Sequence, residues 1–385
     1  MRFPGFEGAW EFISLGKKCT CFSGGTPDST NKELYGGTIP FIRSAEIDEA
    51  DTQLFLTDEG LEQSSAKEVE VRDLLLAMYG ANSGEVAISK INGAINQAIL
   101  CIRSNSLDTH FLKYFLERDK ERIINRYLQG GQGNLSAEII KELRFPFPAL
   151  IAQHKISHFL ELVDDRIVAQ RKLVELLKKH KRGLHSAIFG QKCRVVNADG
   201  KPWPAWRQVR IGDIFQERSE RGGTADELLS VTINNGVKRQ ADTDKKDSSS
   251  EDKSNYKKVL PGDIVYNTMR MWQGASGVSP WAGIVSPAYT VIYPHGRQNT
   301  IFWAYAFKYW RLIQEFQKFS QGLTSDTWNL KYPQLSDIRV YEPSMDEQEA
   351  IVDILSMLDE RVSAAEQELN KMRNLKSGLL QQLFV

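Results

Sequence analysis

The chain is built from two copies of one unit, and this internal repeat restricts its fold more than any other feature. At an ungapped offset of 195 positions, Asn134-Leu135 aligns with Asn329-Leu330, and Lys113-Tyr114 aligns with Lys308-Tyr309. The same offset also pairs Arg144 with Arg339, Pro148 with Pro343, Gln153 with Gln348, Asp164 with Asp359, and Lys181 with Lys376. Nearer the start of each copy the offset becomes 190 and then 196, as loop insertions and deletions produce. The chain therefore divides into two related halves of roughly 195 residues.

Each half ends in a pattern that predicts a long helix. Apolar residues recur in alternating steps of four and three, which is the seam of a coiled coil sustained over more than four heptads. The seam positions are Ile156, Leu160, Val163, Ile167, Gln170, Val174, Leu177, Lys181, Leu184 and Ile188 in the first half. In the second half they are Ile351, Leu355, Leu358, Val362, Ala365, Leu369, Met372, Lys376, Leu379 and Leu383. At about 1.5 Å per residue each helix is roughly 50 Å long, and the capping-box spacing of Ser344 and Glu347 predicts where the second begins.

The charges of the two helices predict that they pair with each other. Residues 149–192 hold nine Lys or Arg against four Asp or Glu, whereas residues 344–385 hold four against eight. A basic and an acidic helix prefer each other over self-association, so we expect an intramolecular coiled coil. The alternative is that each helix packs separately on its own domain. Lys181 and Lys376 occupy matching seam positions, where a lysine either extends toward solvent or fixes the register.

The remainder of each half is predicted to be a mixed α/β domain. Strand-like runs lie at 39–42, 73–77 and 263–266, and helical patterns follow at about 108–127 and 299–319. Residues 242–254 are dense in Asp, Lys and Ser, and we expect a mobile loop there. The expected domains are residues 1–147, the helix at 148–192, residues 193–342 and the helix at 343–385.

Composition and motifs favour a binding protein over an enzyme. There are 49 Lys and Arg against 49 Asp and Glu, so nucleic-acid binding would require positive charge gathered on one face. Phosphate-loop, HExxH and GxSxG motifs are absent, and no Pro-Pro pair occurs that an adenine-methylating Asn-Pro-Pro motif would need. Gly130–Gly133 is interpreted as a flexible loop, the cysteines as reduced thiols, and no catalytic, cofactor or metal residues are expected. The amino terminus lacks a signal-peptide pattern and no apolar run could span a membrane, which predicts a cytoplasmic protein.

Several short sequence segments resemble those of a known protein family. Ser23-Gly24-Gly25-Thr26-Pro27 is followed by Tyr35-Gly36-Gly37-Thr38-Ile39-Pro40-Phe41-Ile42-Arg43. Ile95–Ala98 and Val285–Tyr289 look like paired phrases in mid-domain, and Pro148–Gln153 and Pro343–Gln348 like paired helix starts. With the repeat, these phrases resemble the specificity (S) subunit of type I restriction–modification systems. The usual Glu before the Gln is matched only by Glu347, since Ala152 takes its place in the first half.

The resemblance implies an α+β fold of two target-recognition domains separated by two long helices, which form an antiparallel coiled coil with pseudo-twofold symmetry. It implies that each domain reads one half of a bipartite double-stranded DNA target, and that the helices dock two methyltransferase (M) subunits and possibly restriction (R) subunits. The S subunit itself is non-catalytic, and S-adenosylmethionine is expected on the methyltransferase subunit. Such a helix pair matches the dyad of duplex DNA. The alternative function is a non-enzymatic coiled-coil scaffold whose repeated domains bind proteins.

Candidate DNA contacts are polar or basic residues expected on loops of the two domains. Asn82 and Ser83 lie in a Gly-rich turn suited to reading base edges, and residues 267–273 take the corresponding place in the second domain. Lys17, Lys90, Lys238 and Arg239 are expected to touch phosphates. The candidates of the first domain are Lys17, Thr26, Arg43, Ser44, Tyr79, Asn82, Ser83, Lys90, Asn92 and Gln132. Those of the second are Arg218, Arg221, Lys238, Arg239, Asn267, Arg270, Trp272, Gln273, Gln321 and Thr324.

Overall fold

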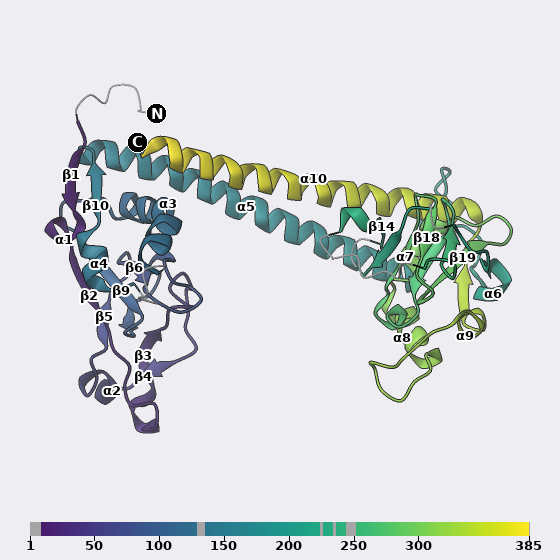
Figure 1. The fold of residues 1–385 in the computed structure, drawn as a ribbon, viewed down its shortest axis with the longest axis horizontal. Coiled ribbons are helices and arrows are strands. Elements are labelled where there is room, and N and C mark those ends of the chain that lie inside the picture. The colour runs from purple at the N-terminus through teal and green to yellow at the C-terminus, as the bar shows by residue number, and fades with distance from the viewer. Residues whose placement is uncertain (1–8, 129–134, 224–225, 234–235, 244–251, 385) are drawn as a thin grey trace. The chain divides into compact units, whose positions relative to one another are not determined.

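A computed structural model of the chain describes residues 9–128, 135–223, 226–233, 236–243 and 252–384 (Figure 1). The chain forms two compact units. Unit 1 comprises Met1–Lys172 together with Glu366–Val385, and unit 2 comprises Leu173–Ala365. The end of the chain therefore returns to the unit in which the chain began.

Unit 1 contains two four-stranded sheets and a two-stranded sheet. Their strand orders are β2-β9-β6-β7, β4-β3-β8-β5 and β1-β10. The strands are β1 (Glu11–Ser14), β2 (Thr20–Ser23), β3 (Tyr35–Ile42), β4 (Phe55–Leu56), β5 (Lys67–Val69), β6 (Leu74–Ala77), β7 (Val86–Ile88), β8 (Gly93–Ile95), β9 (Ile99–Arg103) and β10 (Arg144–Phe147). The helices are α1 (Leu15–Lys18), η1 (Lys32–Leu34), α2 (Asp58–Glu62), α3 (Thr109–Leu128) and α4 (Ala137–Glu142).

Unit 2 repeats most of this arrangement. Its sheets have the orders β12-β19-β16-β17, β11-β20, β15-β18 and β13-β14. The strands are β11 (Arg207–Arg210), β12 (Phe215–Glu217), β13 (Leu229–Thr232), β14 (Gly236–Arg239), β15 (Lys257–Val259), β16 (Ile264–Asn267), β17 (Ser276–Val278), β18 (Gly283–Val285), β19 (Tyr289–Pro294) and β20 (Arg339–Glu342). The helices are α6 (Ile211–Ile214), η2 (Gln240–Asp242), η3 (Met271–Gln273), α7 (Thr300–Ala306), α8 (Trp310–Phe319) and α9 (Tyr332–Ser336).

The strand register confirms the internal repeat residue by residue. Leu74 pairs with Ile88 in unit 1, and Ile264 pairs with Val278 in unit 2, so both partners are displaced by 190 positions. The β1–β10 and β11–β20 pairs also correspond, with Ile13 opposite Phe145 and Val209 opposite Val340. The units differ where β13–β14 replaces the β3–β4 part of the second sheet. The predicted strands at 39–42, 73–77 and 263–266 are all present.

The central strands are buried on both faces. In β6, Leu74 and Leu76 belong to the main core with α3, whereas Leu75 and Ala77 face the core between the two sheets. This alternation follows from the two-residue period of a strand. The predicted helix at 108–127 is α3, but the pattern at 299–319 forms two helices, α7 and α8, with a break at 307–309.

The two predicted long helices are α5 (Leu150–Phe189) and α10 (Met345–Leu383), and their seam positions are buried or partly buried, none of them exposed. Ile167 and Val174 are buried on α5, while Leu162 and Leu176 on its other faces are more than half exposed. In unit 1, Ile156 and Leu160 share a core with Leu380, Leu383 and Phe384. In unit 2, Ile188 and Phe189 share a core with Ile351, Val352 and Leu355. The beginning of each helix thus meets the end of the other, which is antiparallel packing.

The predicted start of the second helix is also confirmed. Ser344 precedes α10 and its hydroxyl accepts a hydrogen bond from the Glu347 amide at 3.4 Å. The other half of the capping box is missing, because the buried Glu347 carboxylate instead binds the Arg194 guanidinium at 2.9 Å. The expected loop at 242–254 lies largely outside the described residues, as does Gly130–Gly133.

Candidate nucleic-acid interface and helix joints

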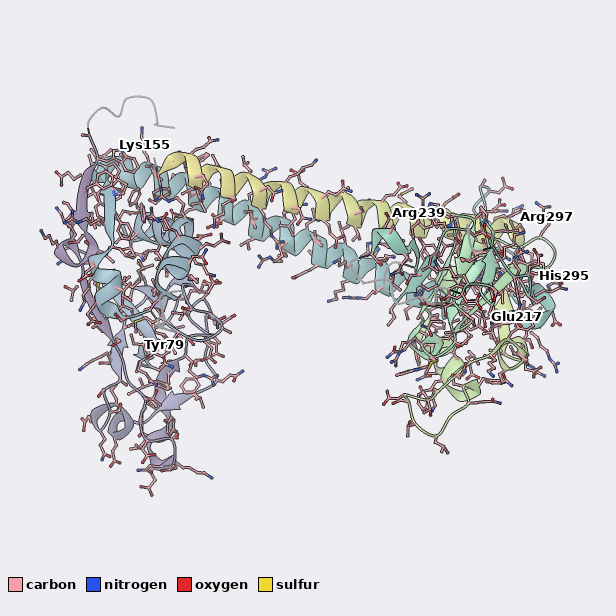
Figure 2. The ribbon with its side chains drawn as sticks, in the orientation of Figure 1. Tyr79, Lys155, Glu217, Arg239, His295 and Arg297 are labelled. Carbon is pink, nitrogen blue, oxygen red and sulfur yellow. The ribbon has the colours of Figure 1, made fainter. Side chains whose placement is uncertain are left out.

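The strand connection predicted to read bases in unit 1 is a compact turn between β6 and β7. Gly80 and Gly84 adopt positive φ angles of 86° and 80°, which only glycine adopts without strain. The Ser83 hydroxyl donates to the Met78 carbonyl at 3.0 Å. The Tyr79 hydroxyl, labelled in Figure 2, donates to the Gln97 carbonyl. Backbone and side chains therefore hold the turn in one conformation, with Tyr79, Asn82 and Ser83 partly exposed.

The corresponding connection in unit 2 lies between β16 and β17 and has the same length. Its η3 segment ends at Gly274, which has the same φ of 80° as Gly84. The Trp272 indole N–H donates to the Met269 carbonyl at 3.0 Å, and its ring packs edge-on against Trp328 at 5.2 Å. Arg270 and Gln273 are exposed on this connection. Charged and amide groups capable of reading base edges are thus presented from a rigid turn.

A repeated leucine braces both turns from a later loop. The Leu135 amide donates to the Met78 carbonyl at 3.0 Å, and the Leu330 amide donates to the Thr268 carbonyl at 2.9 Å. These leucines belong to the identical Asn-Leu pairs that revealed the repeat. In unit 2 the brace brings Gln321 and Thr324 to the same region, because the backbones of Gln321 and Asn329 pair with each other.

Thr26 is linked to this turn through Gln97, because the Thr26 hydroxyl bonds the Gln97 side chain and the Tyr79 hydroxyl bonds the Gln97 carbonyl. The Arg43 guanidinium binds Glu46 at 2.8 Å, and Lys90 lies 3.0 Å from an Asp48 carboxylate oxygen. The Asn92 side chain accepts from the Val71 amide at 2.8 Å. Lys17 is exposed at the end of α1, Ser44 is partly exposed after β3, and Gln132 lies outside the described residues.

Among the candidates of unit 2, Arg218 has the least freedom to contact DNA. Its guanidinium forms two bonds of 2.8 and 2.9 Å to the buried Asp263 carboxylate, and its side chain is only 12% exposed. Arg221 bonds the Asn255 side chain, Lys238 is partly buried on β14, and the Asn267 side chain accepts from the Met269 amide. Arg239 (Figure 2) pairs with Glu227 at 3.2 Å. The structure thus gathers Asn267, Arg270, Trp272, Gln273, Gln321 and Thr324, and leaves these four Arg and Lys residues on other strands and loops.

Each unit also contains a joint in which a tyrosine, an aspartate and a lysine come from three helices. In unit 1, Asp164 of α5 accepts from the Tyr114 hydroxyl of α3 at 2.8 Å and pairs with Lys376 of α10 at 2.8 Å. In unit 2, Asp359 of α10 accepts from the Tyr305 hydroxyl of α7 at 2.6 Å and pairs with Lys181 of α5. We call these the Tyr–Asp–Lys joints. They bind each domain to both long helices.

The joints settle two points that the sequence left open. Lys181 and Lys376 pair with carboxylates across the helix seam instead of extending to solvent, which favours a register-fixing role. The identity of Lys113-Tyr114 with Lys308-Tyr309 is not a structural equivalence, because Tyr305 takes the place of Tyr114. The helix is displaced by four residues relative to that alignment.

Electrostatics support charged joints. Burial alone would raise the pKa of Asp164, but the hydrogen bond from Lys376 and the charge of Lys113 hold it below its usual value. Burial would lower the pKa of Lys376, yet Glu117 and Asp164 raise it. Burial and the bond to Asp359 raise the pKa of Tyr305 to about 12. Both partners of the unit 1 ion pair therefore stay charged around neutral pH.

A repeated glutamine fixes the start of each long helix. In unit 1 the Gln153 side chain accepts from the Asp108 amide at 3.0 Å and donates to the Pro148 carbonyl at 2.8 Å. In unit 2 Gln348 accepts from the Asn299 amide at 2.9 Å and donates to the Pro343 carbonyl at 3.2 Å. The repeated Pro and Gln identities of the sequence thus mark one clamp that joins each long helix to its domain.

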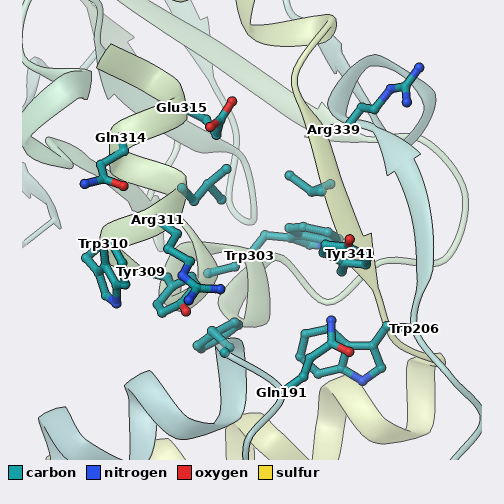
Figure 3. A pocket seen from close by; sticks show the side chains of 15 residues that line it. Gln191, Trp206, Trp303, Tyr309, Trp310, Arg311, Gln314, Glu315, Arg339 and Tyr341 are labelled. Atoms are coloured by element: carbon teal, nitrogen blue, oxygen red, sulfur yellow. The ribbon is translucent and has the colours of Figure 1, made fainter. Parts of the chain in front are cut away.

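Unit 2 contains a cavity of about 540 Å³, and Figure 3 shows that aromatic side chains from several elements line it. Phe189, the last residue of α5, lies on its floor, 6.4 Å from Trp206 and 6.2 Å from Tyr309 between ring centres. Trp310 and Tyr341 are exposed at its rim. Because the floor is part of the core that anchors the end of α5, we assign these aromatic residues a packing role.

The described residues show neither a cluster of metal ligands nor a membrane-spanning helix. No group of three or more His, Cys, Asp or Glu in that part of the chain could hold a metal ion. No described helix is both long enough and apolar enough to cross a membrane.

Each copy of the repeat contains one joint and one turn of the kind described above. We call the β6–β7 and β16–β17 connections the recognition turns. Residues 7–178 and 205–373 each match the family described as the type I restriction modification DNA specificity domain. The chain belongs to the type I restriction–modification specificity family. The family match falls twice on the chain, once on each copy of the repeat, so the duplication is a duplication of the specificity domain.

Curated relatives in this family come from Methanocaldococcus jannaschii. The type I restriction enzyme MjaIX specificity subunit is 27% identical over 217 residues, which cover 51% of this chain and 49% of that protein. The MjaVIII specificity subunit is 24% identical over 185 residues, covering 47% of this chain and 42% of that protein. The chain thus spans about half the length of the curated relatives it matches.

Solved structures of the specificity family share the fold over nearly the whole chain. The S subunit of the type I system from M. genitalium has a TM-score of 0.59 at 16% identity and covers 100% of this chain and 97% of its own. A chain from a study of complex assembly and conformational transition of the type I R-M system has a TM-score of 0.61 at 17% identity, covering 98% of each. These likenesses confirm the predicted fold class of two mixed domains with two long helices.

Sequence reasoning missed the joint residues Tyr114 and Tyr305 and assigned no function to Asp164 and Asp359, although it aligned the two aspartates. A usable signal was present, because Asp164 and Lys181 are each repeated in the second half. The repeat did not show which aspartate each lysine binds, because each lysine pairs with the aspartate of the other long helix.

Proposed function

We propose that this chain is the DNA specificity subunit of a type I restriction–modification complex, with one domain for each half of a bipartite target. The observation that carries the proposal is the duplication of the specificity domain, with equivalent turns after β6 and β16. Each turn is braced by a leucine amide and presents polar groups beside it. Because unit 1 presents Asn82 and Ser83 while unit 2 presents Arg270 and Gln273, we expect two different half-sites.

In this proposal the chain catalyses no reaction itself. Methyl transfer would be carried out by two methyltransferase subunits that hold S-adenosylmethionine. Restriction subunits are an optional further partner, and the complex would act in the cytoplasm, where the host DNA lies. The long helices provide apolar positions for such partners outside the seam. Leu162 in unit 1 and Leu176 in unit 2 are each 54% exposed on α5, and in this proposal the partner subunits cover such positions.

Methylation mapping tests the proposal. The full chain is expressed with its cognate modification subunit in a host lacking type I systems, and the methylated adenines are located by sequencing. We expect methylation at one bipartite motif, none with either subunit alone, and no methyltransferase or nuclease activity in the purified lone chain. Methylation by the lone chain, or methylation without a bipartite motif, would contradict the proposal.

Paired variants assign the half-sites. Arg270→Ala with Gln273→Ala should relax only one half of the motif, and Asn82→Ala with Ser83→Ala should relax only the other half. Loss of a good bidentate contact costs about 1–3 kcal/mol of discrimination, so roughly 10-fold or more in preference at the affected base is expected. Each pair serves as the control for the other, and a change in both halves by one pair would refute one domain per half-site.

A further inference from the structure

A second cavity in unit 2 is distinctly basic. It has a volume of about 820 Å³, and its wall includes four cationic side chains, Lys178, Lys181, Arg182 and Lys308, against one carboxylate, Asp359. Asp359 already pairs with Lys181 in the Tyr–Asp–Lys joint. In a chain with 49 cationic and 49 acidic residues, such a local excess of positive charge is informative. We call this site the basic cavity.

The positive charge of the basic cavity comes mainly from one face of α5. Lys178, Arg182 and His185 follow one another at helical spacings of four and three, and Lys181 lies beside them. Lys178 and Arg182 are exposed, and Lys181 is 28% exposed. Across the cavity, α7 contributes Ile301, Ala304 and Tyr305, so charged groups stand beside low-dielectric walls. That arrangement concentrates the electrostatic field on an anion.

The basic cavity shares a wall with the recognition turn of unit 2. Ser276 and Gly277 line the cavity, and they follow Gln273 after two intervening residues. Three or four residues of chain span at most roughly 14 Å. One full helical turn of DNA is about 34–36 Å long, so this span is less than half of one turn. A duplex whose bases reach Gln273 therefore carries its neighbouring phosphates close to the cavity.

Lys308 stabilises this shared wall. Its ammonium donates to the carbonyl oxygens of Ile233 at 3.0 Å and Ser276 at 3.1 Å, and to that of Gly274. It thereby ties the end of β13 and the recognition turn to the start of β17. Burial lowers the pKa of Lys308 to about 8. Because its three donors are used by the protein, Lys308 is a positioning residue. Lys178 and Arg182 are the exposed cationic side chains of the cavity wall, so an incoming phosphate meets them first.

We propose that the basic cavity binds the phosphate backbone of duplex DNA next to the half-site read by unit 2, through Lys178 and Arg182. This contact deepens the proposed function and rests on it. It is independent of sequence, since phosphates carry no base identity. It anchors the duplex beside the recognition turn and extends DNA contact from the domain onto the long helix.

Salt dependence of binding tests the proposal. The full chain and the Lys178→Gln/Arg182→Gln variant are titrated with the bipartite duplex found by methylation mapping. The KCl concentration runs from roughly 50 to 300 mM, a range over which added salt weakens binding that depends on phosphate contacts. Each lost phosphate contact should reduce the slope of log K against log salt by about 0.9, so the double variant should lose about 1–2 units. Its base preference should stay unchanged. A matched control, Lys192→Gln/Arg361→Gln, removes the same charges from exposed positions outside the cavity and should keep the wild-type slope to within about 0.3.

A second arm locates the phosphates. Methylphosphonate linkages, which are neutral, replace the phosphates flanking the unit 2 half-site, and we expect them to lower the slope of the wild-type chain but not that of the double variant. An unchanged slope in the double variant overturns the proposal. If the double variant keeps the wild-type slope but binds the modification subunit more weakly, the proposal is also overturned, and the cavity is assigned to a protein partner.

The outcomes separate the two proposals. If the wild-type chain prefers its motif over a scrambled duplex and the double variant keeps the wild-type slope, the cavity proposal fails and the proposed function stands. If the wild-type chain shows no preference for any motif, the proposed function fails, and the cavity proposal fails with it because no half-site exists for the cavity to flank.

Discussion

Replacing Lys376 by Met should destabilise unit 1 more than the equivalent change, Lys181→Met, destabilises unit 2. Lys376 and Asp164 are 14% and 27% exposed and 2.8 Å apart, whereas Asp359 in the other joint is 43% exposed. Removing one partner of a fully buried ion pair costs about 3–5 kcal/mol. Asp164 keeps the Tyr114 hydroxyl and Lys113 as partners, so we expect about 2 kcal/mol in unit 1. In unit 2, solvent screening reduces the loss to about 1 kcal/mol or less.

Two local readouts measure the units separately in the full chain. Hydrogen exchange followed by mass spectrometry in urea gives the free energy of unfolding of unit 1. Seven of the eight tryptophans belong to unit 2, so tryptophan fluorescence reports mainly on that unit. The matched controls are Lys371→Met on α10 and Lys179→Met on α5, both exposed lysines on the same helices. Each control should change stability by less than about 0.5 kcal/mol.

A double-mutant cycle and a pH series complete the test. Lys376→Met combined with Asp164→Asn should show a coupling of about 1–2 kcal/mol. The lowered pKa of Asp164 means that its contribution is present above the unfolded value of about 3.9 and is lost as pH falls through the folded value. The raised pKa of Lys376 means that its contribution is present below about 10.4 and is lost as pH rises through the folded value. A cost of Lys376→Met equal to that of Lys371→Met, or no coupling, would refute the joint.

Three further predictions concern unit 1, with Gly378→Ala as a contrast to the first. Gly84→Ala places a Cβ 2.9 Å from the Ile124 Cδ1 at a φ of 80°, and it should lower the free energy of unfolding by about 1–2 kcal/mol in thermal melts. Gly378→Ala lies in open space on α10 and should instead raise the free energy of unfolding by about 0.5–1 kcal/mol. Gln153→Leu leaves the Asp108 amide without its acceptor and should cost about 2 kcal/mol, with faster hydrogen exchange at Asp108. The hydrogen bond from Arg43 lowers the pKa of Glu46 to about 2, and bonds from Gln53 and Thr52 help it against the opposing effect of burial. Glu46→Gln should therefore destabilise unit 1 at pH 7 and lose this effect as pH falls from about 4.3 toward about 2. An equal effect at both ends of this pH series would rule out a stabilising charge on Glu46.

The architecture could be predicted from the sequence because repeats and periodicity report on faces and order. The seam positions on α5 and α10 are buried or partly buried, as the spacing predicted, and the 190-residue offset reappears in the strand register of β6 and β16. Contacts between particular side chains were harder to predict from the sequence. Arg218 is predicted to contact DNA, and its sequence position gives no sign that its guanidinium binds Asp263 in the protein. A residue's type and loop position do not reveal which neighbour the fold will supply.

The same pair shows how the repeat preserves an interaction while exchanging the residues that make it. In unit 1 the arginine bound to Asp73 is Arg103, on β9, and its guanidinium lies over the Phe22 ring of β2. In unit 2 Arg218 follows β12, the counterpart of β2, and lies over the Tyr293 ring of β19. Arginine and aromatic ring have changed strands, while both arginines bind equivalent aspartates. Sequence alignment pairs Asp73 with Asp263 but cannot find their arginines, because these occupy different columns.

The Tyr–Asp–Lys joints explain why the long helices pair antiparallel within one chain. The residue numbers of Asp164 and Lys376, and of Lys181 and Asp359, have the same total, 540, so one antiparallel register satisfies both ion pairs. A parallel pairing of the repeated helices would bring Asp164 to Asp359 and Lys181 to Lys376. Like charges at a seam are destabilising. Net charge predicted that α5 and α10 would pair, but it could not give the orientation, because one joint places its lysine on the basic helix and the other on the acidic helix. The orientation is therefore selected by the order of one aspartate and one lysine along each copy of the repeat.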